Sequence, residues 1–175
     1  MTLKEELALV KQAQTGDRSA LGLLIDAINP KLYGYLLNTL RHTELAEDCL
    51  QQTWLKAISN LPRFRPRGVR FSAWLFAIAR NVCREHWRHS HHEQLPEQVP
   101  DQSDNAALAE RLEEKLLIEK IMLQLTPADQ EILRLRYIGE LSFKEIAAVL
   151  TIAPLTARLR AHRARAHARA ILNRS

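Results

Sequence analysis

Along most of this chain, hydrophobic residues recur every three or four positions, the spacing typical of amphipathic α-helices. The predicted helices cover residues 3–14, 20–27, 31–40, 43–60 and 106–125, with a further one beginning at residue 71. Asp17 and Ser19 are candidate caps for the second helix. An internal proline removes a helical hydrogen bond, so Asn29–Pro30 is expected to interrupt or end this helix. Glycine, at 5 of 175 residues, is too scarce for a turn-rich β structure, and the pattern therefore predicts an all-α fold.

The helix predicted over residues 43–60 has one apolar and one polar side. Thr43 is expected to cap its first turn. Its buried stripe is expected to consist of Leu45, Cys49, Trp54, Leu55 and Ile58. The side that remains for solvent or for a partner carries Asp48, Gln51, Gln52 and Lys56.

The stretch from Leu141 to Arg165 has the pattern of a helix-turn-helix. Ser142 and Glu145 have the spacing of a capping box, and Pro154 suits the first turn of a second helix after a short break. This second helix is basic, and no acidic residue follows Glu145. Its arginines stand at positions 158, 160, 163, 165, 169 and 174. Such a pair of helices typically places its second member in the DNA major groove.

Charge is distributed unevenly along the chain, whose formal net charge is +5. Residues 49–92 contain one acidic residue against one lysine and seven arginines. Residues 93–105 contain two prolines and several acids but no aromatic residue, a composition typical of a flexible linker. We therefore expect two small helical domains, residues 1–92 and 106–175, joined by an acidic linker, with the helix-turn-helix in the second domain.

The first predicted domain combines arginines with aromatic side chains, which suits phosphate contact together with stacking of unpaired bases. Arg80, Arg84 and Arg88 recur every four residues on one face of the helix that begins at residue 71. Trp87 lies beside them and suits base stacking and a core position equally. Trp74 is expected to belong to the core. The basic face is therefore a candidate surface for single-stranded DNA.

Four histidines crowd the end of this helix, namely His86, His89, His91 and His92. A zinc site needs converging ligands, and neither a cysteine nor a carboxylate pair stands nearby at a familiar spacing. We therefore expect no metal and no cofactor, and assign the histidines a weak, pH-dependent positive charge. The chain also has no glycine-rich phosphate loop, nucleophile motif or paired carboxylates, so it is predicted not to be an enzyme.

The two cysteines, Cys49 and Cys83, have apolar neighbours on predicted helix faces and are expected to be buried free thiols. The acidic, amphipathic amino terminus lacks the apolar core of a signal peptide. No apolar run approaches the ~20 residues needed to span a bilayer. We expect a cytoplasmic protein.

Two sets of motifs occur in a characteristic order. The first half contains AEDCLQQTWLKA at 46–57, LPRF at 61–64 and FSAWLFAIARN at 71–81. The second half contains LTP at 125–127, ILRLRY at 132–137, LSFKEIA at 141–147, and TAR and HRAR within 156–165. Over nearly its whole length the chain thus resembles the extracytoplasmic-function (ECF) sigma factors, minimal members of the sigma-70 family of bacterial RNA polymerase.

The resemblance implies a subunit that binds core RNA polymerase, directs initiation at promoter DNA and is commonly held inactive by an anti-sigma factor. It implies docking on the polymerase clamp through Asp48, Gln51, Gln52 and Lys56. It further implies that a base of the minus-ten element is extruded from the duplex and held in a pocket of the protein. The resemblance assigns this element to Arg65, Arg67, Arg70, Arg80, Asn81, Arg84, Trp87 and Arg88. It assigns the minus-thirty-five element, read from the major groove, to Thr156, Arg158, Arg160, Arg163 and Arg165.

Some positions of the helix-turn-helix depart from the family pattern. Thr151 occupies a turn position commonly held by glycine, where a β-branched residue resists a positive φ. Leu155 and Leu159 replace small residues, whereas Ala157 and Ala161 replace larger core residues. These exchanges favour loose packing or a shifted register of the recognition helix.

The alternative hypothesis is a self-standing helix-turn-helix transcription regulator. Such a protein would bind duplex DNA tightly without polymerase. It would leave the basic and aromatic first half of the chain without a role, so the sigma-factor hypothesis is favoured.

Overall fold

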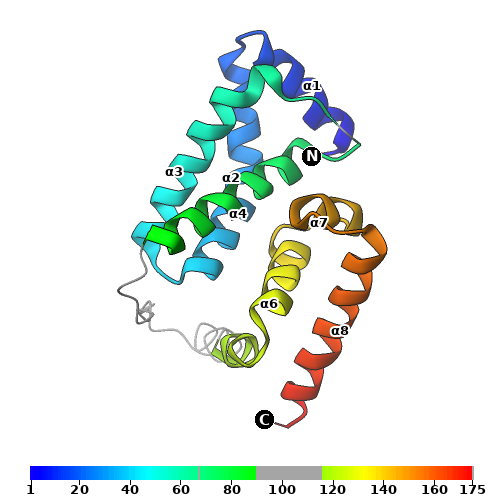
Figure 1. Cartoon of the computed structure of the whole chain (residues 1–175). Helices are drawn as coiled ribbons and strands as arrows, with labels where there is room; N and C mark the ends of the chain where they lie inside the picture. The colour runs from blue at the N-terminus through cyan, green and yellow to red at the C-terminus, as the bar shows by residue number, and fades with distance from the viewer. Residues whose placement is uncertain (67, 90–115, 175) are drawn as a thin grey trace, which may run out of the picture.

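The computed structural model describes residues 1–66, 68–89 and 116–174 (Figure 1). Every regular element within these residues is a helix, which confirms the predicted all-α class. The first half contains α1 (Leu3–Gln14), α2 (Arg18–Leu40), α3 (Thr43–Asn60), η1 (Leu61–Arg63) and α4 (Phe71–His89). The second half contains α6 (Pro127–Leu133), η2 (Arg134–Ile138), α7 (Phe143–Leu150) and α8 (Pro154–Leu172), preceded by helical residues 116–124. The predicted linker at 93–105 lies outside the described residues.

The first half is built by packing consecutive helices, α1 on α2, α2 on α3 and α3 on α4. Its core includes Tyr35 and Phe76, whose ring centroids are 5.3 Å apart in an edge-to-face arrangement. Glu6 of α1 is buried, and its carboxylate accepts a 2.6 Å hydrogen bond from the backbone N–H of Ser72. The carboxylate therefore satisfies a donor at the amino end of α4.

The predicted break at Asn29–Pro30 is wrong, because α2 runs without interruption from Arg18 to Leu40. An internal proline costs a helix about 3 kcal/mol. Apolar residues on both sides of it are buried, and full burial of each large side chain contributes about 1.5–3 kcal/mol. The Oδ1 atom of Asn29 also accepts a 2.6 Å hydrogen bond from Nε1 of Trp54. Tertiary packing thus outweighs the local cost of the proline.

Two expectations for α3 are also wrong. The residue that caps the helix is His42, whose Nδ1 accepts a 3.4 Å hydrogen bond from the N–H of Leu45, and Thr43 is already helical. Leu55 and Ile58 are 65% and 41% exposed rather than buried. The packed stripe of α3 is narrow and consists of Ala46, Cys49, Thr53, Trp54 and Ala57. Helices α2 and α4 therefore leave two large apolar residues of α3 at the surface.

The helix-turn-helix is confirmed. Ser142 and Glu145 form a complete capping box at the start of α7, and Pro154 occupies the first turn of α8. Thr151 ends α7 in the left-handed region with φ +56°. The buried residues of α8 include Ala157, Ala161 and Ala164, whose small side chains let α8 approach α6 and α7 closely. The exchange to alanine therefore produces close approach rather than loose packing.

The left-handed conformation of Thr151 leads to a stability prediction. A β-branched residue with this φ is strained, and Thr151→Gly should raise the free energy of unfolding by about 1 kcal/mol. Thermal denaturation should show the gain as an increase in Tm of about 3 °C. Thr43→Gly, within the regular first turn of α3, is the matched control and should give no increase. A Tm for Thr151→Gly at or below the wild-type value would contradict the strain.

The two halves of the molecule pack against each other through α4 and α7 (Figure 1). A second contact joins α2 with η2. Gly139 lies at this junction, where an added Cβ would come within 3.1 Å of the Phe76 ring and 2.8 Å of the Leu135 carbonyl oxygen. The buried residues of both halves form one continuous hydrophobic core. The halves thus share an interface of apolar and, as described below, charged contacts.

Cys49 and Cys83 are buried free thiols, as expected. Their side chains face each other from α3 and α4, and a hydrogen bond to Cys49 together with burial raises the pKa of Cys83. No helix among the described residues is long and apolar enough to cross a membrane.

Candidate nucleic-acid interface

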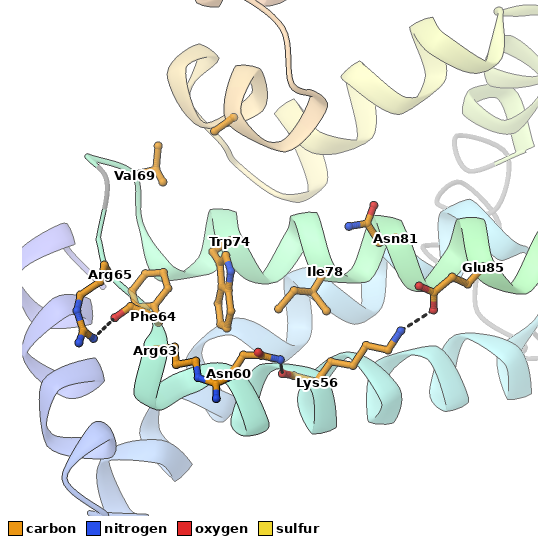
Figure 2. Close-up of a pocket in the computed structure, with 11 residues that line it drawn as sticks. Lys56, Asn60, Arg63, Phe64, Arg65, Val69, Trp74, Ile78, Asn81 and Glu85 are labelled. Atoms are coloured by element: carbon orange, nitrogen blue, oxygen red, sulfur yellow. Dashed lines mark hydrogen bonds and ion pairs between the residues drawn. The ribbon is translucent and has the colours of Figure 1, made fainter.

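A pocket of about 650 Å³ opens where α3, the loop after η1 and α4 meet (Figure 2). From α3 and η1 it is lined by Lys56, Asn60 and Arg63. The loop contributes Phe64, Arg65 and Val69, and α4 contributes Trp74, Ile78, Asn81 and Glu85. Ala148 of α7, from the other half of the molecule, completes the lining.

Aromatic contacts fix the wall of this pocket. The ring of Trp74 lies 4.9 Å from the ring of Phe64 and 5.3 Å from that of Phe71, measured between centroids. The Nε2 atom of Gln14 in α1 donates hydrogen bonds of 2.8 and 2.9 Å to the carbonyl oxygens of Leu61 and Phe64. Gln14 thus holds the turn that carries Phe64, the ring against which Trp74 packs.

The pocket has the size and chemistry to hold a planar, polar group such as a nucleobase. Trp74 supplies an aromatic face for stacking. Asn60 donates through Nδ2 to the Lys56 carbonyl oxygen at 2.8 Å, which orients its amide at the rim. Lys56 and Arg63 add positive charge, and Lys56 is paired with Glu85 of α4. The sequence did not assign Asn60, Arg63 or Glu85 to a binding site, because the pocket forms only where separate elements meet.

The residues assigned to the minus-ten element lie in two different environments. Asn81, Arg84, Trp87 and Arg88 are exposed on α4, with Trp87 at 43% exposure. Arg65 is also exposed, and its Nη1 donates to the Phe64 carbonyl oxygen at 3.0 Å. Arg67 lies outside the described residues. These exposed cations and Trp87 form a basic, aromatic surface that continues from the pocket along α4.

Arg70 and Arg80 are turned toward the second half of the molecule. Nε of Arg80 lies 2.6 Å from Oε1 of Glu131 in α6, and the two side chains are 19% and 26% exposed. Nε of Arg70 lies 2.6 Å from Oε1 of Glu145 in α7, and its Nη2 lies 3.1 Å from Oε2. In this arrangement Arg80, from the predicted basic face of α4, and Arg70, from the loop before it, are both held in ion pairs, and their assignment to the minus-ten element stays a prediction. Both are neutralised by carboxylates that stand far away in the sequence.

A third ion pair at the same interface joins Lys31 of α2 to Glu140. Nη2 of Arg70 additionally donates to the Glu140 carbonyl oxygen at 3.2 Å, and the buried Arg134 donates through Nε to Asn38 at 3.3 Å. We call this packed state of the two halves, with Arg70–Glu145 and Arg80–Glu131 paired, the closed arrangement.

Glu145 is the most strongly perturbed acid of the interface. Burial alone would raise its pKa, but hydrogen bonds from Arg70 and Ser142 outweigh burial and lower the pKa to about 2. A lowered folded-state pKa stabilises the fold above the ordinary carboxyl value, and this contribution disappears as the pH falls toward 2. Glu145 is therefore ionised in the closed arrangement at neutral pH.

This titration predicts a pH dependence for the variant Glu145→Gln. The wild-type protein should unfold at higher temperature than Glu145→Gln above about pH 4.5, and the difference should shrink as the pH falls toward about 2. Thermal melts of both proteins between pH 2.5 and 7 measure this difference in Tm. The other carboxyl groups titrate in both proteins, so their contributions cancel in the difference. Glu119→Gln, at an exposed position, should track the wild type. A pH-independent difference would show that the charge of Glu145 does not contribute.

The residues assigned to polymerase docking lie together on α3. Asp48, Gln51, Gln52 and Lys56 are all exposed. Leu55 and Ile58, which were expected in the core, extend this surface. The result is a mixed polar and apolar face on one helix, a composition suited to a protein interface. Neither the leucine nor the isoleucine could be assigned to it from periodicity alone.

The residues assigned to the minus-thirty-five element lie on α8. Arg158, Arg160, Arg163 and Arg165 are exposed, and Thr156 is half-buried.

Of the histidine cluster, His86 is half-buried on α4, whereas His91 and His92 lie outside the described residues. Within the part of the chain that is described, no three potential ligand side chains gather as a metal site.

Comparisons with known proteins agree with this geometry. The family models for Sigma-70 region 2 and Sigma-70, region 4 match residues 24–92 and 115–167. RNA polymerase sigma factor CarQ from Myxococcus xanthus is 36% identical over 77% of this chain and 78% of its own. ECF RNA polymerase sigma factor BldN from Streptomyces coelicolor is 30% identical over 82% of this chain, a match that covers 57% of BldN.

Among solved structures, CnrH in complex with the cytosolic domain of CnrY superimposes with a TM-score of 0.76 and 26% identity. The superposition covers 98% of this chain and 99% of CnrH, so the likeness includes both halves. The two region models occupy the same two halves in the same order. This chain therefore belongs to the extracytoplasmic-function sigma factors of the sigma-70 family.

Proposed function

We propose that this chain binds core RNA polymerase and directs it to promoters that carry a minus-ten and a minus-thirty-five element. The observation that carries the proposal is the aromatic-walled pocket between α3 and α4, which adjoins an exposed basic surface. A stand-alone duplex-binding regulator needs no such pocket. The chain itself catalyses no reaction in this proposal, and acts in the cytoplasm with the polymerase.

In the first half, the pocket would receive a base extruded from the minus-ten element. Extrusion costs a few kcal/mol of lost stacking, which stacking on Trp74 and hydrogen bonds at the pocket rim would offset. The exposed residues Arg65, Asn81, Arg84, Trp87 and Arg88 would then follow the single strand, the cations contacting its phosphates. The pocket thus supplies base recognition, and α4 supplies sequence-independent affinity.

In the second half, α8 would enter the major groove at the minus-thirty-five element. Its amino-terminal turns would approach the base edges, as in other helix-turn-helix proteins. Thr156, Arg158 and Arg160 lie within the first two turns, and Arg163 and Arg165 follow in the third and fourth turns. The whole of α8 contains no acidic residue, so no side chain of the helix repels the phosphates.

Promoter binding requires the closed arrangement to open. Arg70 and Arg80 cannot contact DNA while Glu145 and Glu131 hold them, and Ala148 of α7 lies at the pocket. We propose that docking of the α3 face on core polymerase separates the two halves and releases both arginines. Asp48, Gln51, Gln52 and Lys56, together with the exposed Leu55 and Ile58, would make this contact.

The same α3 face suits a second protein that keeps the chain from polymerase, which would be an anti-sigma factor. The solved relative CnrH is bound by the cytosolic domain of another protein, CnrY. Exposed apolar side chains on an otherwise polar helix support such a contact here. Affinity capture of the chain from unstressed native cells should recover a protein other than polymerase that competes with core enzyme in solution.

Reconstituted transcription tests the proposed function. The chain is mixed with core polymerase, and transcripts are mapped on a library of genomic fragments. We expect discrete start sites, with permanganate-reactive, unpaired thymines at the minus-ten element. If no fragment gives a discrete start site, and the chain alone binds duplex DNA tightly, the result would favour the stand-alone regulator.

A further inference from the structure

The outward face of α8 carries two exposed leucines in its first two turns. Leu155 and Leu159 are 67% and 48% exposed. They stand four residues apart, so they lie one above the other on the same face. Leu159 is two positions from each of the buried residues Ala157 and Ala161, a rotation of about 200° around the helix. The two leucines therefore point away from the core of the domain.

Arginines flank these leucines on both sides. One flank carries Arg158 and Arg165, each one residue after a buried alanine. The other flank carries Arg160 and Arg163, each one residue before a buried alanine. One residue corresponds to a rotation of about 100°, so the two pairs lie on opposite sides of the outward face. The face has an apolar centre between two cationic edges.

This arrangement matches the major groove of DNA. The floor of the groove displays base edges, among which the 5-methyl group of thymine is the apolar one, and phosphates line both walls. A second copy of this chain would instead bring two sets of arginines together, which is unfavourable. We propose that Leu155 and Leu159 face the bases of the minus-thirty-five element and select thymine through its methyl group.

In this proposal the flanking arginines position the helix on the phosphates, and the leucines carry the sequence preference. This differs from a recognition helix whose arginines read guanine edges. The inference rests on the proposed function of α8 and adds to it the class of base that the helix recognises.

The test uses the full chain together with core polymerase. The DNA duplexes are randomised at the minus-thirty-five element and carry a constant minus-ten element. Each thymine enriched by selection is then replaced singly by deoxyuridine, which pairs identically but lacks the methyl group. We expect each contacted thymine to lose about four-fold in affinity, the equivalent of one buried methyl group. Leu155→Ala and Leu159→Ala should each abolish the thymine preference at one position.

Leu172→Ala is the matched control, because it removes a leucine of similar exposure, 45%, from the far end of α8. This control variant should keep the wild-type ratio of affinities for thymine and deoxyuridine at every position. The inference is overturned by an enriched upstream element without thymine, by equal affinity for both bases at every position, or by unchanged ratios in Leu159→Ala. A dimer that dissociates in Leu159→Ala would overturn it by assigning the face to a second copy. Absence of enrichment together with absence of specific initiation would contradict the proposed function itself.

Discussion

The double variant Glu131→Gln and Glu145→Gln is expected to bind minus-ten single-stranded DNA, without polymerase, more tightly than the wild-type chain. Each substitution removes the carboxylate that holds a predicted DNA-contacting arginine at 2.6 Å. Glutamine keeps an acceptor oxygen but loses the charge, and a hydrogen bond to a charged group contributes about 1 kcal/mol more than a neutral one, so weakening either pair should raise affinity about five-fold. Fluorescence anisotropy with a labelled minus-ten strand measures the affinity, and small-angle X-ray scattering measures the separation of the halves.

Glutamine suits this experiment because it keeps the size of glutamate. At position 145 it can also preserve the capping box with Ser142, in which glutamine is a regular alternative. Glu119→Gln, at an exposed position, makes the same substitution at a single site and should leave affinity and radius of gyration near the wild-type values. An unchanged radius and affinity in the double variant would mean that the ion pairs do not restrain the closed arrangement.

Removal of Arg80 and Arg84 should have the second largest effect, on promoter opening by the polymerase holoenzyme. In the open complex both arginines would contact the phosphates of the minus-ten strand. The slope of log affinity against log salt should fall by about 0.7 for each phosphate of the single strand that is no longer neutralised. Filter binding at several salt concentrations gives this slope, and permanganate footprinting measures opening.

The two single variants separate DNA contact from closure. Arg84→Ala should only weaken DNA binding, because Arg84 is exposed on α4. Arg80→Ala also breaks the pair with Glu131, so its loss of affinity in the free chain should be smaller than in the holoenzyme. Arg18→Ala, at an exposed site in the first turn of α2, is the matched control. A wild-type salt slope in the variant that lacks both Arg80 and Arg84 would place these two arginines away from the DNA.

The closed arrangement also connects the chemistry of Glu145 to the function of the protein. Its carboxylate caps α7 through Ser142 and, at the same time, neutralises Arg70 of the other half. The capping interaction belongs to the helix-turn-helix alone, whereas the ion pair exists only while the halves are together. One side chain therefore contributes both to the stability of the helix-turn-helix and to its packing against the first half.

What the sequence by itself determined about this protein is its all-α class and the starts of several helices. Asp17 accepts hydrogen bonds at the start of α2, Ser142 and Glu145 cap α7, and Pro154 begins α8, all as predicted. These features depend on contacts within four residues along the chain, so the order of the residues specifies them. The arginine-rich and apolar spacing of α8 is local in the same sense.

The tertiary structure decided the continuity of α2 through Pro30, the exposure of Leu55 and the lining of the pocket. It also decided which arginines are free. The pairs Arg80–Glu131 and Arg70–Glu145 join positions 51 and 75 residues apart. No periodicity links such positions, because their distance depends on how whole helices pack. Helix propensity and capping act over one turn, whereas burial and ion pairing between the halves arise only after the helices have assembled.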